Sequence, residues 1–422
     1  MYKHFIGGGG YPPYVKYIVS SLLIGALVWH IYGFIQSCLI DFPIQFLDGQ
    51  EFFITYGAGF VRRGLTGEVL MLLTKLTHIS PITAIKVLVI CVYVFFSIWM
   101  LVKCRCAGWS WWLCLSPLAC GLTAYIIRKD YLQLALLIPI LTLCKSQRIN
   151  SLHGLAITFL IIIELLIHEA FFFWGAPIPM LMLLMYSRKK IIGAIYCGVI
   201  LMLQVALCFH HGTPEIANAI IESWQGLFKE ASELRGSGLS GLSWEAVTTF
   251  RSHIHMNFQD QTDTGMGWGV SVLRLVTFLI NGFVVTQFVN TFTRAAGSDQ
   301  GSEHSLLMTN LYLLLCVCMI PMFTLLSCDY ARLYQYLTVT SMMSFLMLPH
   351  AKLKSALSWF FPRSIHRCVG AINRLSLTRR QWIVSILLLF AGDAPFGYDF
   401  QRWFSATVFG AVYDALSSLF TQ

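Results

Sequence analysis

Long runs of apolar residues, separated by short polar stretches, recur along most of this chain. A helix that crosses the hydrocarbon core of a bilayer needs about 20 consecutive apolar residues, and the runs have this length. The pattern predicts an all-α polytopic membrane protein with roughly 10 to 12 transmembrane helices. We expect helices at 17–38, 82–102, 107–126, 131–146, 152–170, 171–187, 191–209, 268–292, 305–326, 333–349 and 382–398, with 403–420 as a further span or a surface helix.

Three longer polar stretches interrupt what we interpret as a single integral membrane domain over 1–422. Segment 39–80 contains GFVRRGLTGEVLMLLTKL, which carries too much charge to span easily and predicts an external amphipathic or re-entrant helix. Segment 210–266 is expected to be the one large external loop, with a helical stretch that covers the site as a lid or binds an acceptor. Segment 350–381 is expected to be a basic cytoplasmic loop.

Composition supports this class. With 57% hydrophobic and 12% charged residues over 422 positions, the chain has too little polar surface for a soluble globular protein. The net charge of +9 does not indicate a nucleic-acid partner, because polytopic proteins carry Lys and Arg in cytoplasmic loops. The 13 cysteines are mostly dispersed through apolar runs and are interpreted as core residues. No A-x-A cleavage signature follows the first apolar run, so we expect it to remain as a helix and the N-terminus to be cytoplasmic.

Acidic residues are distributed unevenly between the two expected membrane faces. The inward segments hold 17 of the 29 Lys and Arg residues, but only Asp299 and Glu303 of the 20 acidic residues. Acidic residues contribute little to membrane topology, so their crowding on the outward side indicates a functional site there. The alternative is that outward loops are longer and hold more residues of every kind.

The outward charges gather at the ends of four apolar runs. These are Arg62, Arg63 and Glu68 in GFVRRGLTGE; Arg128, Lys129 and Asp130 in IIRKDYL; His168 and Glu169 in LLIHEAFFFW; and Asp329 and Arg332 in CDYARLYQY. Unpaired charge near lipid is costly, so we expect these groups to meet in one outward cleft.

The residues of the first two groups suit the binding of an anionic substrate. Arginine presents a planar fork that matches phosphate, and glycines around the pair permit close approach of the backbone. The alternatives are that the arginines contact lipid headgroups or pair with Glu68, and that an Arg128–Asp130 pair staples a hairpin. The predicted substrate-binding residues are Arg62, Arg63, Glu68, Arg128, Lys129 and Asp130.

The other two groups supply the predicted catalytic residues. A histidine beside a carboxylate can be held in one tautomer and act as a general base, so His168 or Glu169 is expected to accept a proton from a sugar hydroxyl. Asp329 and Arg332 lie one helical turn apart and are expected to position sugars. The alternative for His168 is an ordinary packed histidine. Asp329 and the His210–His211 pair are the next candidates for the base.

Metal binding is not predicted. The histidines and aspartates of the large loop do not have the spacing of zinc or calcium ligands, so we expect neither a metal nor another cofactor. The residues concerned are His210, His211, His253, His255, Asp260 and Asp263.

The FVRRGL-G-E segment, the RKD hairpin and the late D-Y-x-R-x element together resemble the Wzy-type O-antigen and surface-polysaccharide polymerases of bacteria, and more distantly the GT-C glycosyltransferases. The resemblance implies a GT-C-like fold and metal-independent glycosyl transfer on the periplasmic face of the inner membrane. It also implies donor and acceptor oligosaccharides linked to undecaprenyl diphosphate, and it admits a chain-length regulator as a partner beside the lipid bilayer.

Three other functions remain open. A GT-C transferase with a polyprenyl-phosphate sugar donor would use the same face of the membrane. A transporter of lipid-linked glycans should show internal repeats and charges near the bilayer midplane, and no clear repeat is found. A membrane acyltransferase should show an arginine–histidine group for acyl-CoA on the inward side, and none is found.

Overall fold

The computed structural model describes residues 51–107, 129–210, 212–224, 227, 301–322 and 330–361. The described residues are mostly helical and contain no strand, as the all-α prediction requires. The expected helices at 17–38, 268–292, 382–398 and 403–420, and residues 108–126 of another, lie outside these ranges. The elements are η2 (Glu51–Phe53), α4 (Leu65–Thr77), α5 (Pro81–Cys106), α8 (Asp130–Cys144), α9 (Ser151–Ile167), α10 (Phe171–Trp174), α11 (Pro177–Tyr186), α12 (Lys190–Phe209), α13 (Pro214–Trp224), α18 (Gly301–Pro321), α19 (Tyr330–Met347) and α20 (His350–Phe360).

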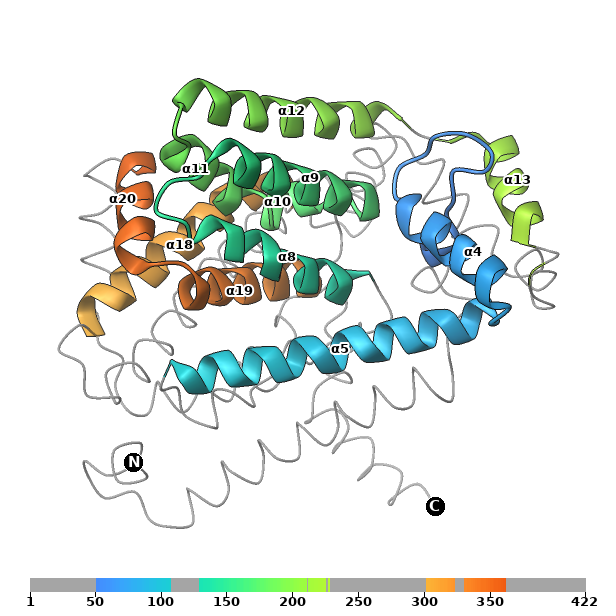
Figure 1. Ribbon diagram of the computed structural model, residues 1–422, viewed down its shortest axis with the longest axis horizontal. Helices are drawn as coiled ribbons and strands as arrows, with labels where there is room; N and C mark the ends of the chain where they lie inside the picture. Colours follow the sequence, from blue (N-terminus) through green and yellow to red (C-terminus); the bar gives the residue numbers. More distant parts are fainter. Residues whose placement is uncertain are drawn as a thin grey trace, which may run out of the picture.

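The long helices lie side by side, as Figure 1 shows. Helix α8 packs against α5 and α9, α9 packs against α12, and α18 packs against α19. Helices α4 and α13 lie at one end of this bundle, and α20 lies across the other end (Figure 1). The bundle therefore has two distinct ends, one with α4 and α13 and the other with α20.

One expected helix is divided in the structure. The sequence predicts a single helix over 171–187, but α10 ends at Trp174 and α11 begins at Pro177. Proline has no backbone N–H and restricts the residue before it, so Pro177 begins a helix rather than continuing one. The preceding helix α9 also ends three residues earlier than expected, and His168 has extended backbone angles. Glu169 therefore lies in a turn between two helices.

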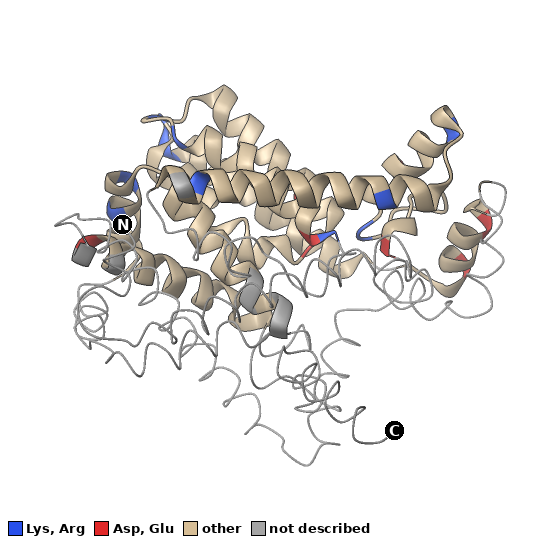
Figure 2. Cartoon of the chain, turned by 90° about the horizontal axis from the view of Figure 1, so that it is seen from below, with Lys and Arg blue, Asp and Glu red and all other residues tan. Residues whose placement is uncertain are grey.

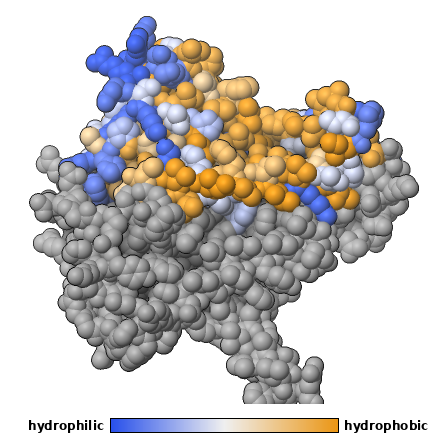
Figure 3. Space-filling model, turned by 60° about the horizontal axis from the view of Figure 1, so that its bottom comes forward, coloured by the Kyte–Doolittle hydropathy of each residue, from blue (hydrophilic) through white to orange (hydrophobic). Residues whose placement is uncertain are grey.

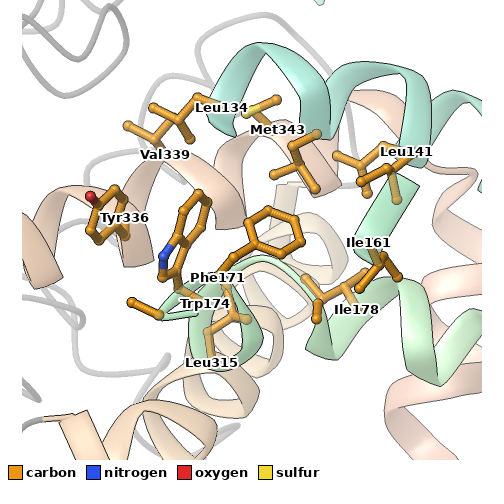
Figure 4. Close-up of a cluster of buried hydrophobic side chains, with 14 of the residues drawn as sticks. Leu134, Leu141, Ile161, Phe171, Trp174, Ile178, Leu315, Tyr336, Val339 and Met343 are labelled. Atoms are coloured by element: carbon orange, nitrogen blue, oxygen red, sulfur yellow. The ribbon is translucent and has the colours of Figure 1, made fainter. Parts of the chain in front are cut away.

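The core of the bundle is rich in aromatic side chains. Trp174 and Tyr336 stack with ring centroids 4.4 Å apart, and Phe171 packs edge-on against Trp174 at 4.9 Å. Figure 4 shows these rings surrounded by aliphatic side chains of α8, α9, α11, α18 and α19. Phe171 and Trp174 of the FFFW stretch thus belong to the buried core.

Two of the described helices are long and apolar enough to cross a membrane, Pro81–Cys104 of α5 and Lys190–Phe209 of α12. Only 28% of the most apolar part of each is buried inside the protein, whereas a core helix of a soluble protein is mostly buried. Figure 3 shows hydrophobic residues over much of the described surface, with hydrophilic residues concentrated towards one end. The exposed apolar side chains of these two helices are Val87, Val94, Phe95, Ile98, Val102, Ile191, Ile195, Val199, Leu201, Met202, Val205 and Phe209.

The end of the bundle that carries α20 is held by a lysine. The ammonium of Lys352 donates hydrogen bonds of 2.7 Å to the carbonyl oxygens of Cys144 and Ser146, at the C-terminus of α8. A cation at this position satisfies carbonyl groups that have no partner within the helix and interacts favourably with the helix dipole. The 350–381 segment, expected to be a basic loop, thus begins with a helix that is fixed to the bundle.

Candidate functional site

The segment between η2 and α4 is fixed by close backbone contacts. Glu68, in the first turn of α4, accepts a hydrogen bond of 3.0 Å from the backbone N–H of Tyr56. A Cβ atom at Gly64 would lie 2.3 Å from the Tyr56 ring, and a Cβ atom at Gly67 would lie 2.0 Å from the Ile54 carbonyl oxygen. Only glycine fits these two positions. The glycines of the GFVRRGLTGE motif therefore let the loop pack directly against α4.

Arg63 has a left-handed backbone conformation, with φ of 64°. A non-glycine residue in this region costs about 1–3 kcal/mol, so other contacts must hold it there. One such contact comes from Lys129, whose ammonium donates a hydrogen bond of 2.9 Å to the Arg63 carbonyl oxygen. The loop before α4 and the start of α8 are thereby joined.

The Arg63 side chain pairs with Glu169, which is 106 residues away in the sequence. Its Nε atom lies 3.1 Å from Oε1 and 2.9 Å from Oε2 of the carboxylate, and its Nη2 atom lies 2.7 Å from Oε1. Arg62 contributes a longer contact of 3.4 Å from Nη1 to Oε1. The carboxylate partner of the arginines is therefore Glu169 and not Glu68, the partner considered from the sequence.

Two further charges complete a charge cluster that consists of Glu51, Arg62, Arg63, Lys129 and Glu169. The Glu51 carboxylate lies 3.8 Å from Nη1 of Arg63, and the Glu51 and Lys129 residues are almost completely buried. The cluster holds three cations and two carboxylates, and the buried carboxylate of Asp130 belongs to the residue next to Lys129. Such a buried group is costly to desolvate, and its cations are of the kind that bind an anion.

Burial and mutual attraction set the ionisation of the cluster. Burial raises the pKa of Glu169, but Arg63 and Arg62 outweigh it and hold that pKa well below its usual value. Burial lowers the pKa of Arg62 to about 10, against the attraction of Glu169. Burial likewise lowers the pKa of Lys129 to about 8, against the attraction of Glu51. All three groups are therefore mainly charged at neutral pH.

His168 makes a hydrogen bond within its own turn, and its predicted role as a general base stays a prediction. Its Nδ1 atom lies 3.1 Å from the backbone nitrogen of Ala170, whose N–H can only donate, so Nδ1 accepts this hydrogen bond. A neutral ring then carries its proton on Nε2. The 3.7 Å contact between Nδ1 and Oε2 of Glu169 is longer than a hydrogen bond and shares no proton in this tautomer. His168 thus shapes the turn that presents Glu169.

The structure brings together Arg62, Arg63, Lys129, His168 and Glu169 from the predicted set. Asp130 is buried at the first residue of α8, next to Lys129. Glu68 fixes the Tyr56 backbone, as described above. Arg128 and Asp329 lie outside the described residues, and Arg332 falls within α19 in a part whose side chain is not described. Its proposed role with Asp329 stays a prediction.

Two residues at the site were not predicted from the sequence. Glu51 belongs to the cluster, although nothing in the DGQEFF stretch indicates its partner. Gln133 donates hydrogen bonds of 3.1 and 3.2 Å to the carbonyl oxygens of Glu164 and His168, which fixes the end of α9. A signal for Gln133 was present, because an amide in the apolar run of α8 requires partners when it is buried.

The cluster joins four segments at one end of the bundle, namely η2, the loop before α4, the start of α8 and the turn after α9. Figure 2 shows the charged positions of the described residues in separate groups, with a long uncharged stretch of helix between them. No group of three or more His, Cys, Asp or Glu residues that could hold a metal ion occurs among the described residues. Chemically, the arrangement can bind an anion and stabilise developing negative charge.

Comparisons with known proteins give no information about the role of this site. No protein-family model, no curated protein and no solved structure matches the chain.

Proposed function

We propose that this chain is a multi-pass protein of the bacterial inner membrane that polymerises oligosaccharide repeat units linked to undecaprenyl diphosphate, in the manner of Wzy-type polymerases. The charge cluster faces the periplasm in this proposal, and the N-terminus faces the cytoplasm. The observation that carries it is the buried cluster of three cations and two carboxylates, assembled from distant segments at one end of an apolar helical bundle.

The arrangement of the helices supports one outward site. Helix α8 begins beside Lys129 of the cluster and ends at Cys144, whose carbonyl oxygen accepts a hydrogen bond from Lys352. The cluster and the α20 end are therefore opposite ends of the same helix. The positive-inside rule directs the end that is rich in Lys and Arg to the cytoplasm. The basic residues of that end are Lys103, Lys145, Arg148, Arg188, Lys189, Lys190, Lys352 and Lys354.

The cations of the cluster suit a diphosphate leaving group. As the bond between the sugar and the diphosphate breaks, negative charge grows on the diphosphate, and nearby guanidinium groups stabilise it. Arg63 is bound by Glu169 through three contacts, so we assign it the task of holding the loop and Glu169 in place. Arg62, its neighbour in the loop, is assigned to contact the diphosphate. The buried ammonium of Lys129 is assigned to stabilise the negative charge of the diphosphate from within the protein.

Mass spectrometry of lipid-linked glycans from cells with and without this gene tests the proposal. Loss of a polymerase should cause single repeat units to accumulate on undecaprenyl diphosphate, and expression of the Arg62→Ala variant should not restore polymer. A truncated repeat that lacks one sugar would instead indicate a GT-C transferase. Complete repeats confined to the cytoplasmic leaflet would indicate a transporter, and an unchanged glycan profile would contradict every form of the proposal.

A further inference from the structure

His210 has the ring orientation that His168 lacks. It follows α12 at an exposed position, and its Nδ1 atom lies 2.9 Å from the carbonyl oxygen of Ala206. A carbonyl can only accept, so Nδ1 carries the proton and donates it in this hydrogen bond. The lone pair of the neutral ring is then on Nε2, at the other side of the ring. A backbone carbonyl that fixes one nitrogen in this way leaves the second nitrogen ready to accept a proton.

His210 lies at the rim of the charge cluster. Its ring contacts Phe60 edge-on, with centroids 5.5 Å apart, and Phe60 precedes Arg62 by two residues. Cys208, two residues before His210, is within electrostatic range of both Arg62 and Glu169. The end of α12 and the arginine loop therefore meet at the same outward position.

Phe60 supplies an exposed aromatic surface at this rim. One face of its ring stacks on Tyr56, with centroids 5.4 Å apart and an interplanar angle of 14°. The residue is nevertheless 47% exposed. A fixed aromatic ring with an accessible face attracts the C–H groups of a sugar, since the ring face carries partial negative charge. The Phe60 ring suits the C–H face of a sugar, and the Nε2 atom of His210 suits a hydroxyl group on that sugar.

We propose that His210 is the general base for the acceptor sugar and that Phe60 packs against that sugar. This inference rests on the proposed glycosyl transfer. The acceptor hydroxyl oxygen attacks the anomeric carbon of the donor, and a new carbon–oxygen bond forms. The bond between that carbon and the diphosphate oxygen breaks, and its electron pair leaves on the lipid diphosphate. The hydroxyl proton passes to Nε2 of His210 and then to water.

The test uses the full-length protein in lipid nanodiscs, with repeat units on undecaprenyl diphosphate extracted from cells that lack the gene. Release of lipid diphosphate measures transfer. The variant His210→Asn keeps an N–H group for the Ala206 carbonyl but has no basic nitrogen, and His78→Asn is the matched control at the end of α4. We expect His210→Asn to slow transfer by roughly 10²–10⁴-fold and His78→Asn to leave the rate unchanged.

Two further measurements separate catalysis from folding. Imidazole added to the His210→Ala variant should restore part of the rate, which it cannot do for a misfolded protein. Phe60→Leu should raise KM about tenfold with little change in kcat, whereas Phe159→Leu, at an exposed position of α9, should change neither. Transfer by His210→Asn at the wild-type rate would overturn this inference but not the proposed function. Absence of transfer by the wild-type protein would overturn the proposed function as well.

Discussion

The two ends of the helical bundle use charged residues in different ways. At the α20 end, Lys354 pairs with Glu303 while their side chains are 64% and 52% exposed, and Lys352 binds backbone carbonyl groups. At the other end, Arg63 pairs with Glu169 while their side chains are only 8% and 13% exposed. The first arrangement resembles an ordinary protein surface, and the second places several full charges inside the protein.

This difference indicates what each end is for. An exposed ion pair contributes little to stability, because water screens both partners. A buried pair loses several kcal/mol for each desolvated ion and is often no more stable than a well-packed apolar group. Stability alone therefore does not explain the charge cluster, and this is why we propose that it binds an anionic substrate.

Removal of one buried carboxylate should have the largest effect. We expect Glu169→Gln to destabilise the protein by about 3–5 kcal/mol, because two arginines lose their shared counter-charge inside the protein. The matched variant Glu303→Gln removes an exposed carboxylate and should have little effect. Thermal unfolding of both variants in nanodiscs makes the comparison, and equal melting temperatures would mean that the two ends do not differ.

The pH dependence of stability gives a second test of the contribution of the Glu169 carboxylate. The pKa of Glu169 is lowered in the folded state, so its contribution is complete above its ordinary pKa of about 4.3 and is lost as the pH falls further. As the pH falls below about 4.3, the wild-type protein should therefore lose stability, and the Glu169→Gln variant should not show this loss. An identical decline in both proteins would assign it to other groups.

A smaller effect is expected from the glycines that shape the arginine loop. Gly67→Ala places a Cβ atom 2.0 Å from a backbone oxygen, so the loop must shift, at a cost of about 1–3 kcal/mol. Gly198→Ala in α12 meets no atom within 4 Å and should stabilise the protein by about 0.4–1 kcal/mol. Melting temperatures of the two variants that shift in the same direction would contradict this account of the loop.

A further effect concerns Lys129, whose pKa is lowered to about 8. Between about pH 8 and 10.4 the unfolded state binds more protons than the folded state, so stability should rise with pH in this window. Lys129→Met should remove that rise, and Lys75→Met, at an exposed position of α4, should keep it. Melting curves across the window provide the measurement, and a rise that persists in Lys129→Met would contradict the assignment.

Much of the fold could be predicted from the sequence, because helix length and apolar periodicity are local properties. Helices α5, α8 and α12 begin and end within a few residues of their expected bounds. The division of 171–187 was also readable, since Gly175 and Pro177 stand together in the expected helix. In that case the apolar run was given more weight than the proline.

The site could be predicted only in part. From the cost of buried charge we expected four charged groups to meet in one outward cleft. Residues of three of these groups, Arg63, Lys129 and Glu169, are in contact, while the cleft and the fourth group stay a prediction. The identity of the partners could not be read, because the pairing of Glu169 with Arg63 depends on tertiary packing across 106 residues and that of Glu51 with Arg63 depends on the path of the loop between them. Nor could the tautomers of His168 and His210 be read, since each depends on one backbone group near the ring.

The binding of undecaprenyl diphosphate to the purified protein tests the central claim most directly. Native mass spectrometry of the wild-type protein, Arg62→Lys and Arg62→Ala measures this binding, with Lys189→Ala at the opposite end as the control. We predict that both Arg62 variants bind the diphosphate at least about tenfold more weakly, since an ammonium does not replace the guanidinium fork, while the control binds normally. Equal affinity of all four proteins would contradict the claim that the charge cluster binds a diphosphate.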